Sequence, residues 1–182
     1  MGFLPSMPVC NSLLPRSVRV GGMEKRNMLT ALRERRVQLN QAAEALFEDD
    51  RFAPLGEYQI IEIEAVSVGS LGLEAGATYG EVTARAFELG LFECPLELGP
   101  QLRLQFSNQQ EGPAGYPVTR KEGRAPQGSI TVASAPLDDS DDTPKGFYLR
   151  RVEGVDWLRG YWSWPGHIWS PEEVLVFSRT SW

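Results

Sequence analysis

The sequence has little cysteine and histidine, and it has no long apolar run. Its 182 residues include two cysteines, Cys10 and Cys94, and a single histidine, His167. Neither cysteine belongs to a CxxC pair, and one histidine cannot build a multi-histidine centre, so the usual structural zinc sites are excluded. No run reaches the roughly 18–20 apolar residues of a membrane-spanning helix. We therefore expect free thiols in a reducing cytoplasm and no membrane partner.

Phosphate-binding and nucleophile motifs are also missing. The sequence has no GxxxxGKS/T loop, no GxGxxG fingerprint and no GxSxG elbow. A glycine-rich segment at 69–77 precedes an expected helix, but the nearby Glu74 and Glu81 would repel an anion at that helix end. We expect no cofactor, and no motif assigns a catalytic residue.

The charge balance is acidic, with a net charge of −6 and a pI of about 4.9. An acidic chain repels phosphate backbones, which makes nucleic acid an unfavourable partner. Hydrophobic residues make up 42% and aromatic residues 10%, which is typical of a folded chain and too rich for a disordered one. The length suits one domain.

The first 22 residues are predicted to form an irregular arm. Three prolines interrupt this segment, and a Gly21-Gly22 pair ends it. Met23 directly precedes a helical pattern. We therefore expect residues 23–182 to form a single α+β domain, with residues 1–22 as an upstream extension.

Two helices are expected, at 24–48 and at 78–89. In the first, leucines and alanines recur at steps of three, four and seven, without an internal glycine or proline. In the second, Thr78 and Glu81 have the spacing of a capping box, and Gly90 is placed to end the helix.

The other apolar runs are typical of strands. Residues 57–68 are rich in β-branched side chains, with Ile61, Ile63 and Ala65 expected to face the core. A long polar loop is expected at 108–127. Beyond residue 100, alternation predicts strands at 101–107, 129–135, 147–152, 155–162 and 173–178, with a tight hairpin turn at Glu153-Gly154. The predicted fold class is α+β, with two helices packed on a mostly antiparallel β-sheet of about five to six strands.

Residues 71–106 resemble a family of small, uncharacterised bacterial proteins. The similar segments are GATYGEV, RAFELGL, a CP dipeptide and GPQLRLQF, and GFYLRR, WLRGY and VLVFSR fit more loosely toward the C-terminus. The resemblance implies a bacterial single-domain protein, and such proteins are often carried on mobile gene cassettes. It implies no activity, cofactor or catalytic residue. The 108–127 loop is an insertion relative to the family.

An acidic turn at 138–142 is the sharpest charged feature. Carboxylate oxygens are the ligands that Ca²⁺ and Mg²⁺ prefer, but the spacing lacks the glycine and glutamate of an EF-hand loop. Aspartate and serine also favour solvated turns, so a cation site and a plain turn both stay open. The candidate metal ligands are Asp138, Asp139, Asp141 and Asp142.

Four tryptophans crowd the C-terminal third, and strand alternation separates two of them. Trp157 shares one strand face with Arg159 and Tyr161, whereas Trp162 belongs to the opposite face. Because both faces carry a tryptophan, we expect a helix to cover one face and the other to be partly open. The rings either pack a core or form a platform for a ligand or partner. Residues 164–169 are expected to form a loop.

The preferred function is a non-enzymatic binding or interaction module for an unknown protein or small molecule. Its candidate binding residues are Tyr161, Trp164, His167 and Trp169. The alternative is a small hydrolase or transferase in which His167 acts as a general base beside Glu172 or Glu173. A third alternative is a homodimer formed through the tryptophan-bearing sheet.

Overall fold

The computed structural model describes residues 14–112 and 125–182, which form four α-helices, a 3₁₀ helix and nine strands. The helices are α1 (Lys25–Glu34), α2 (Gln41–Glu48), α3 (Tyr79–Glu88), α4 (Leu98–Gln105) and the 3₁₀ helix η1 (Gly69–Leu71). The strands are β1 (Ser17–Val20), β2 (Gln38–Leu39), β3 (Gln59–Ser67), β4 (Ala77–Thr78), β5 (Ile130–Val132), β6 (Gly146–Val152), β7 (Val155–Tyr161), β8 (Ile168–Trp169) and β9 (Val174–Ser178). None of the helices in these two ranges has the length and apolarity needed to cross a membrane.

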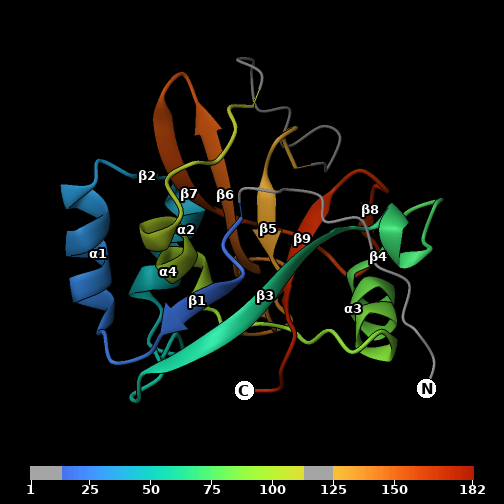
Figure 1. Ribbon diagram of the computed structural model, residues 1–182, viewed down its shortest axis with the longest axis horizontal. Helices are drawn as coiled ribbons and strands as arrows, with labels where there is room; N and C mark the ends of the chain where they lie inside the picture. Colours follow the sequence, from blue (N-terminus) through green and yellow to red (C-terminus); the bar gives the residue numbers. More distant parts are fainter. Residues whose placement is uncertain (1–13, 113–124) are drawn as a thin grey trace.

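A seven-stranded twisted sheet runs through the molecule in the order β1-β3-β9-β5-β6-β7-β2 (Figure 1). Four neighbouring pairs are antiparallel, but β5 pairs with β9 in parallel and β2 pairs with β7 in parallel. The short strands β4 and β8 form a separate antiparallel pair beside α3. The sheet is therefore mixed.

Helices cover the two faces of the sheet unequally. On one face, α1, α2 and α4 pack over the sheet and bury Leu32, Leu46 and Leu102 in one continuous core with Phe147 and Leu158. On the other face, α3 contributes Val82 and Ala86 to a smaller core with side chains of β3 and β9. In Figure 1, α1, α2 and α4 gather on one side of the molecule, and α3 lies on the other. The second face of β5, β6 and β7 has no described helix on it.

Several local predictions are confirmed. β3 occupies 59–67, and Ile61, Ile63 and Ala65 are buried. Thr78 and Glu81 form the capping box of α3: the Thr78 N–H donates to Glu81 Oε2 at 2.8 Å, and the Glu81 N–H donates to Thr78 Oγ1 at 3.4 Å. β6 and β7 form the expected hairpin.

The hairpin turn has the backbone that its sequence predicts. Glu153 and Gly154 connect β6 to β7, with φ angles of 51° and 76°. Two consecutive positive φ angles are the signature of the two-residue turns that match the twist of a hairpin. This turn pairs Val152 with Val155 and thereby sets the register of every later pair.

The predicted fold of two helices on a mostly antiparallel sheet of five to six strands is wrong, although the chain is α+β. The structure has four α-helices, a mixed seven-stranded sheet and a second two-stranded sheet among the described residues. One of the additional helices arises because the helix predicted at 24–48 is broken. Arg36 adopts a φ of 58°, and the chain then forms β2 before α2 begins.

Two other segments differ from their predictions. Residues 101–107, expected as a strand, lie largely in α4, where every side chain from Leu98 to Leu104 is buried. Residues 17–20, assigned to the irregular arm, form β1 and pair with β3. Residues 1–13 of that arm and most of the 108–127 loop lie outside the described residues.

Candidate binding cleft

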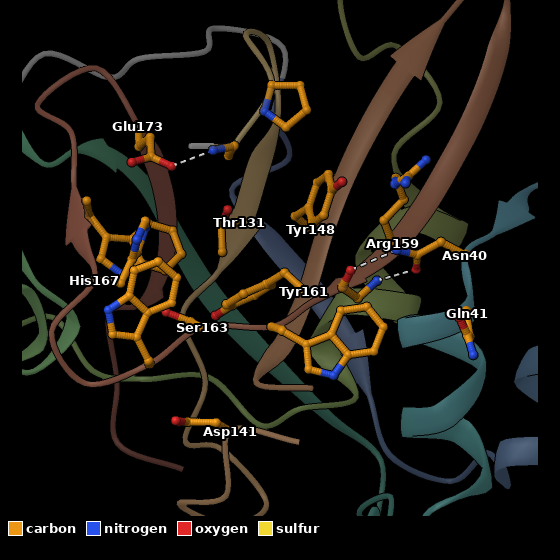
Figure 2. A pocket seen from close by; sticks show the side chains of 16 residues that line it. Asn40, Gln41, Thr131, Asp141, Tyr148, Arg159, Tyr161, Ser163, His167 and Glu173 are labelled. Atoms are coloured by element: carbon orange, nitrogen blue, oxygen red, sulfur yellow. Dashed lines mark hydrogen bonds between the residues drawn. The ribbon is translucent and has the colours of Figure 1, made fainter. Parts of the chain in front are cut away.

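A cleft of about 620 Å³ lies over the part of the second sheet face that no described helix covers. Its floor begins with a row of side chains on three adjacent strands. Thr131 of β5 lies opposite Tyr148 of β6, and Tyr148 lies opposite Arg159 of β7. Tyr161 lies two residues beyond Arg159 and therefore shares its face. Figure 2 shows these side chains across the middle of the cleft.

One wall of the cleft is built from a ladder of aromatic rings. Trp164 contacts His167 edge-on with 5.0 Å between ring centroids, and His167 contacts Trp169 at 5.5 Å. Trp169 in turn meets Tyr161 edge-on at 5.6 Å. The ladder runs from solvent to core, because Trp164 is 53% exposed and Trp169 only 3%. Edge-to-face contacts of this kind hold the rings in fixed orientations.

β8 anchors the buried end of this ladder. The sequence predicted a loop at 164–169, but Ile168 and Trp169 form β8 and pair with Thr78 and Ala77 of β4. The backbone of this segment is thus tied to the N-terminus of α3. The backbone at Gly76 lies directly against that of β8, because an added Cβ at Gly76 would lie 2.6 Å from the Trp169 carbonyl oxygen.

The opposite wall is the N-terminus of α2. Asn40 caps this helix, since its Oδ1 accepts from the Ala43 N–H at 3.0 Å. The same Oδ1 accepts from the Gly160 N–H at 2.8 Å, and Asn40 Nδ2 donates to the Gly160 carbonyl oxygen at 2.9 Å. One amide side chain therefore joins α2 to β7. Asn40 and Gln41 line the cleft beside Arg159 (Figure 2).

Glu173 closes one end of the cleft, and each of its carboxylate oxygens accepts a hydrogen bond from a backbone N–H. Its Oε1 accepts from the Ala125 N–H at 2.8 Å, and its Oε2 accepts from the Ser170 N–H at 2.6 Å. No carboxylate of the described residues forms an ion pair with the His167 imidazole. Glu173 therefore acts on the His167 imidazole through its charge and not through an ion pair.

Burial shifts the pKa values of one histidine and two tyrosines that line the cleft. Burial lowers the pKa of the His167 imidazole below its ordinary value, and the nearby Glu173 partly opposes this. Burial raises the pKa of the Tyr148 phenol, with Arg159 and Arg150 acting in the opposite direction. Burial also raises the pKa of Tyr161, and the charge of Glu93 adds to that shift. At neutral pH the cleft therefore presents a neutral imidazole and neutral phenols.

Two buried donors of the lining have no hydrogen-bond acceptor within the described chain. These are Trp169 Nε1 and Arg159 Nε. A buried donor without a partner costs about 1–3 kcal/mol, so such atoms are uncommon in native folds. Both belong to residues of the cleft lining, whereas Arg103 Nε, Ser129 Oγ and Ser134 Oγ, which also have no partner among the described residues, lie outside it.

Asp138 of the acidic turn at 138–142 is held by hydrogen bonds from neighbouring side chains. Asp138 accepts from Arg51 and from Thr143 Oγ1, and its carbonyl oxygen accepts from Lys145 Nζ at 3.0 Å. The Arg51 guanidinium holds the pKa of the Asp138 carboxyl below its usual range. Over the described ranges, no group of three or more His, Cys, Asp or Glu side chains is placed to share a metal ion. Asp141, however, lies at the rim of the cleft.

The structure brings all four predicted binding residues into one cleft. Tyr161, Trp164, His167 and Trp169 all belong to its lining. Sequence reasoning missed the far wall and the rest of the floor beside Tyr161. The hairpin turn could have revealed part of the floor, because a two-residue turn at Glu153-Gly154 places Tyr148 opposite Arg159. The missed lining residues are Thr131, Tyr148, Arg159, Asn40 and Gln41.

No family model matches the chain, and no curated protein or solved structure is significantly similar to it. The resemblance to small bacterial proteins therefore stays a prediction. The function has to be argued from the cleft alone.

Proposed function

We propose that the protein is a non-enzymatic binding protein that takes a small organic ligand with a flat ring into the aromatic cleft. The observation that carries this proposal is the gathering of six ring-bearing side chains around one concavity. They come from β6, from the end of β7 and from the segment 162–169 that follows it and includes β8. The six are Tyr148, Tyr161, Trp162, Trp164, His167 and Trp169.

Size and shape favour a small ligand over a protein partner. The volume of about 620 Å³ lies within the range of roughly 300–1,000 Å³ common for small-molecule sites. The cleft is concave, whereas protein interfaces are usually broad and nearly flat. A flat ring could pack against Tyr161 on the floor or against Trp164 at the mouth, and aromatic contacts add about 0.5–1.5 kcal/mol each beyond area burial.

The geometry does not favour the alternative of a hydrolase or transferase at His167. Both Glu173 oxygens accept from backbone amides. Glu172, the other carboxylate considered, is exposed to solvent. A binding role needs only the rings and a few polar groups that set orientation. We also propose a cytoplasmic setting, which is consistent with the buried free thiol of Cys94.

The proposal is tested with a series of neutral planar fragments, such as 2-naphthamide, added to ¹⁵N-labelled protein. The five tryptophans give five indole N–H signals. Signals of Trp162, Trp164 and Trp169 are expected to shift. Trp182, whose indole donates to the Glu93 carbonyl oxygen away from the cleft lining, is expected to stay in place. If no fragment of the series moves a cleft indole, the proposal is wrong.

A further inference from the structure

Arg159 is a cation in the cleft without an acidic partner. It forms no ion pair with any carboxylate of the described residues. Its guanidinium lies over the Trp157 ring, with 5.1 Å from its central carbon to the ring centroid. Its positive charge lowers the pKa of the neighbouring Tyr148 phenol, against the larger effect of burial, and its Nε has no acceptor among the described residues. A partly buried guanidinium usually pairs with an anion.

A helix N-terminus adds partial positive charge near Arg159. The N-terminus of α2 lies on the same side of the cleft at Asn40 and Gln41 (Figure 2), and a helix N-terminus carries partial positive charge. This corner of the cleft therefore has a positive potential.

The two acidic groups of the lining do not neutralise that corner. Glu173 lies at the other end of the cleft, next to His167, with both oxygens engaged by amides (Figure 2). Asp141 is exposed at the rim and lies apart from Arg159 in the same view. The cleft thus has one positively charged corner, which favours binding of an anion. The aromatic side chains that line the rest of the cleft favour binding of a flat ring.

We propose that the cleft selects planar organic anions, with the Arg159 guanidinium holding a carboxylate and the aromatic side chains holding the ring. This inference rests on the proposed function and specifies its ligand class. The planar guanidinium fork matches a carboxylate with two parallel N–H···O bonds, which a lysine cannot reproduce. Trp157 supports the guanidinium from behind through the cation–π contact.

The test compares two probes of the same shape, 2-naphthoate and 2-naphthamide, by isothermal titration calorimetry at constant ionic strength. The wild-type protein is expected to bind the carboxylate about tenfold or more tightly than the carboxamide, because a charge-assisted pair is worth about 1.5–3 kcal/mol. In Arg159→Gln the carboxylate is expected to lose this advantage, while the affinity for the carboxamide changes little. In Arg159→Lys, part of the preference is expected to remain.

Arg26→Gln is the matched control. Arg26 is also an arginine, but its side chain is 82% exposed and pairs with Glu24 outside the cleft, so its loss leaves both affinities unchanged. An unchanged indole N–H spectrum for Trp164 and Trp169 verifies that Arg159→Gln remains folded. Equal affinities for the two probes in the wild type would overturn the anion selectivity and leave the proposed function intact. Absence of binding by both probes would contradict the proposed function itself.

Discussion

Gly160 sets how closely α2 approaches β7. A Cβ at this position would lie 2.6 Å from the carbonyl carbon of Ala42 and 2.6 Å from the backbone nitrogen of Ala43. Real Cβ atoms do not approach backbone this closely, so only glycine allows the helix to lie against the strand at this point. Asn40 then bonds both backbone groups of Gly160. A residue without a side chain thereby fixes one wall of the cleft.

Gly160→Ala is expected to push α2 away from β7 and to weaken the Asn40 hydrogen bonds. Overpacking of this kind lowers the free energy of unfolding by about 1–3 kcal/mol, which a urea titration measures. Gly80→Ala is the control: Gly80 lies in α3 with nothing within 4 Å of an added Cβ, and alanine there is expected to be neutral or stabilising. Equal stability of the two variants would contradict the role given to Gly160.

His167 makes the stability of the fold depend on pH. The unfolded chain protonates this imidazole near pH 6.5, whereas burial lowers its pKa in the folded state. Between these two values the unfolded state binds more protons, so the free energy of unfolding falls as the pH drops below about 6.5. The contribution of the neutral His167 imidazole to the free energy of unfolding is fully present above pH 6.5, and it is lost once the pH falls below the pKa of His167 in the folded state.

The single histidine makes this prediction measurable by proton NMR. The imidazole signal of the folded protein is expected to titrate with a midpoint below 6.5. His167→Gln is expected to reduce the slope of melting temperature against pH between about pH 7 and 5.5. A titration midpoint at or above 6.5 in the wild type would show that the imidazole is better solvated than the cleft geometry indicates.

At the scale of elements, two helices with the same type of C-terminus show what sequence reasoning could find. In α3, Gly90 has a φ of 77°, and Leu91 N–H donates to the Ala86 carbonyl oxygen. In α1, Arg36 has a φ of 58°, and Val37 N–H donates to the Leu32 carbonyl oxygen. Both are Schellman ends. Glycine is the usual residue at such a helix end, so the end of α3 was predicted. Arginine is rare there, so the end of α1 was missed.

α4 was missed for a different reason. Helices are recognised by an apolar stripe opposite a polar face, but in α4 both Gln101 and Arg103 are buried along with the leucines. Arg103 tolerates burial because it donates to Gln109 Oε1 at 2.7 Å and to the Phe106 carbonyl oxygen. A helix buried on every side carries no periodicity, and the alternation of Leu102 with Leu104 was read as a strand. Pro100, in the first turn, was an available signal for a helix start.

β1 is integral to the fold, which bears on the prediction that the domain starts at Met23. Val18 and Val20 are buried in the main core. The outer edge of the strand is covered by Gln105 of α4, whose side chain bonds both the N–H and the carbonyl oxygen of Arg19. Glu97 then accepts from the Gly21 N–H at 3.1 Å. Such coverage protects an edge strand from pairing with other chains.

Deleting residues 1–22 is therefore expected to destabilise the protein strongly. Burial of the two valines alone contributes about 3 kcal/mol or more. Gln105 would also lose its hydrogen bonds to Arg19, and Glu97 its hydrogen bond from Gly21. Deletion of residues 1–13 is the control, since it leaves β1 in place. Thermal denaturation should give a clearly lower melting temperature for the longer deletion. Equal melting temperatures would mean that β1 contributes nothing to stability.

At the scale of the whole molecule, the cleft follows from unequal coverage of the sheet. Three helices fill one face, while α3 covers only the β3–β9 part of the other. The expectation of one covered and one partly open face at β7 is confirmed: Leu158 is fully buried in the main core, and Arg159 lines the cleft. Residues near each other in sequence, such as Trp164 and His167, could be grouped in advance. Asn40 and Thr131 could not, because the parallel pairing of β2 with β7 and of β5 with β9 brings distant segments together.

The central claim is that this cleft is where the molecule binds a flat ligand, and the most direct measurement is the position of the bound ring. Intermolecular nuclear Overhauser effects between 2-naphthamide and the protein side chains report that position. The structure predicts contacts to side chains of the cleft lining, among them Trp164, Trp169 and Tyr148. Contacts confined to Tyr58, Phe87 or Trp182, the exposed aromatic side chains of the described residues outside the cleft, would contradict it.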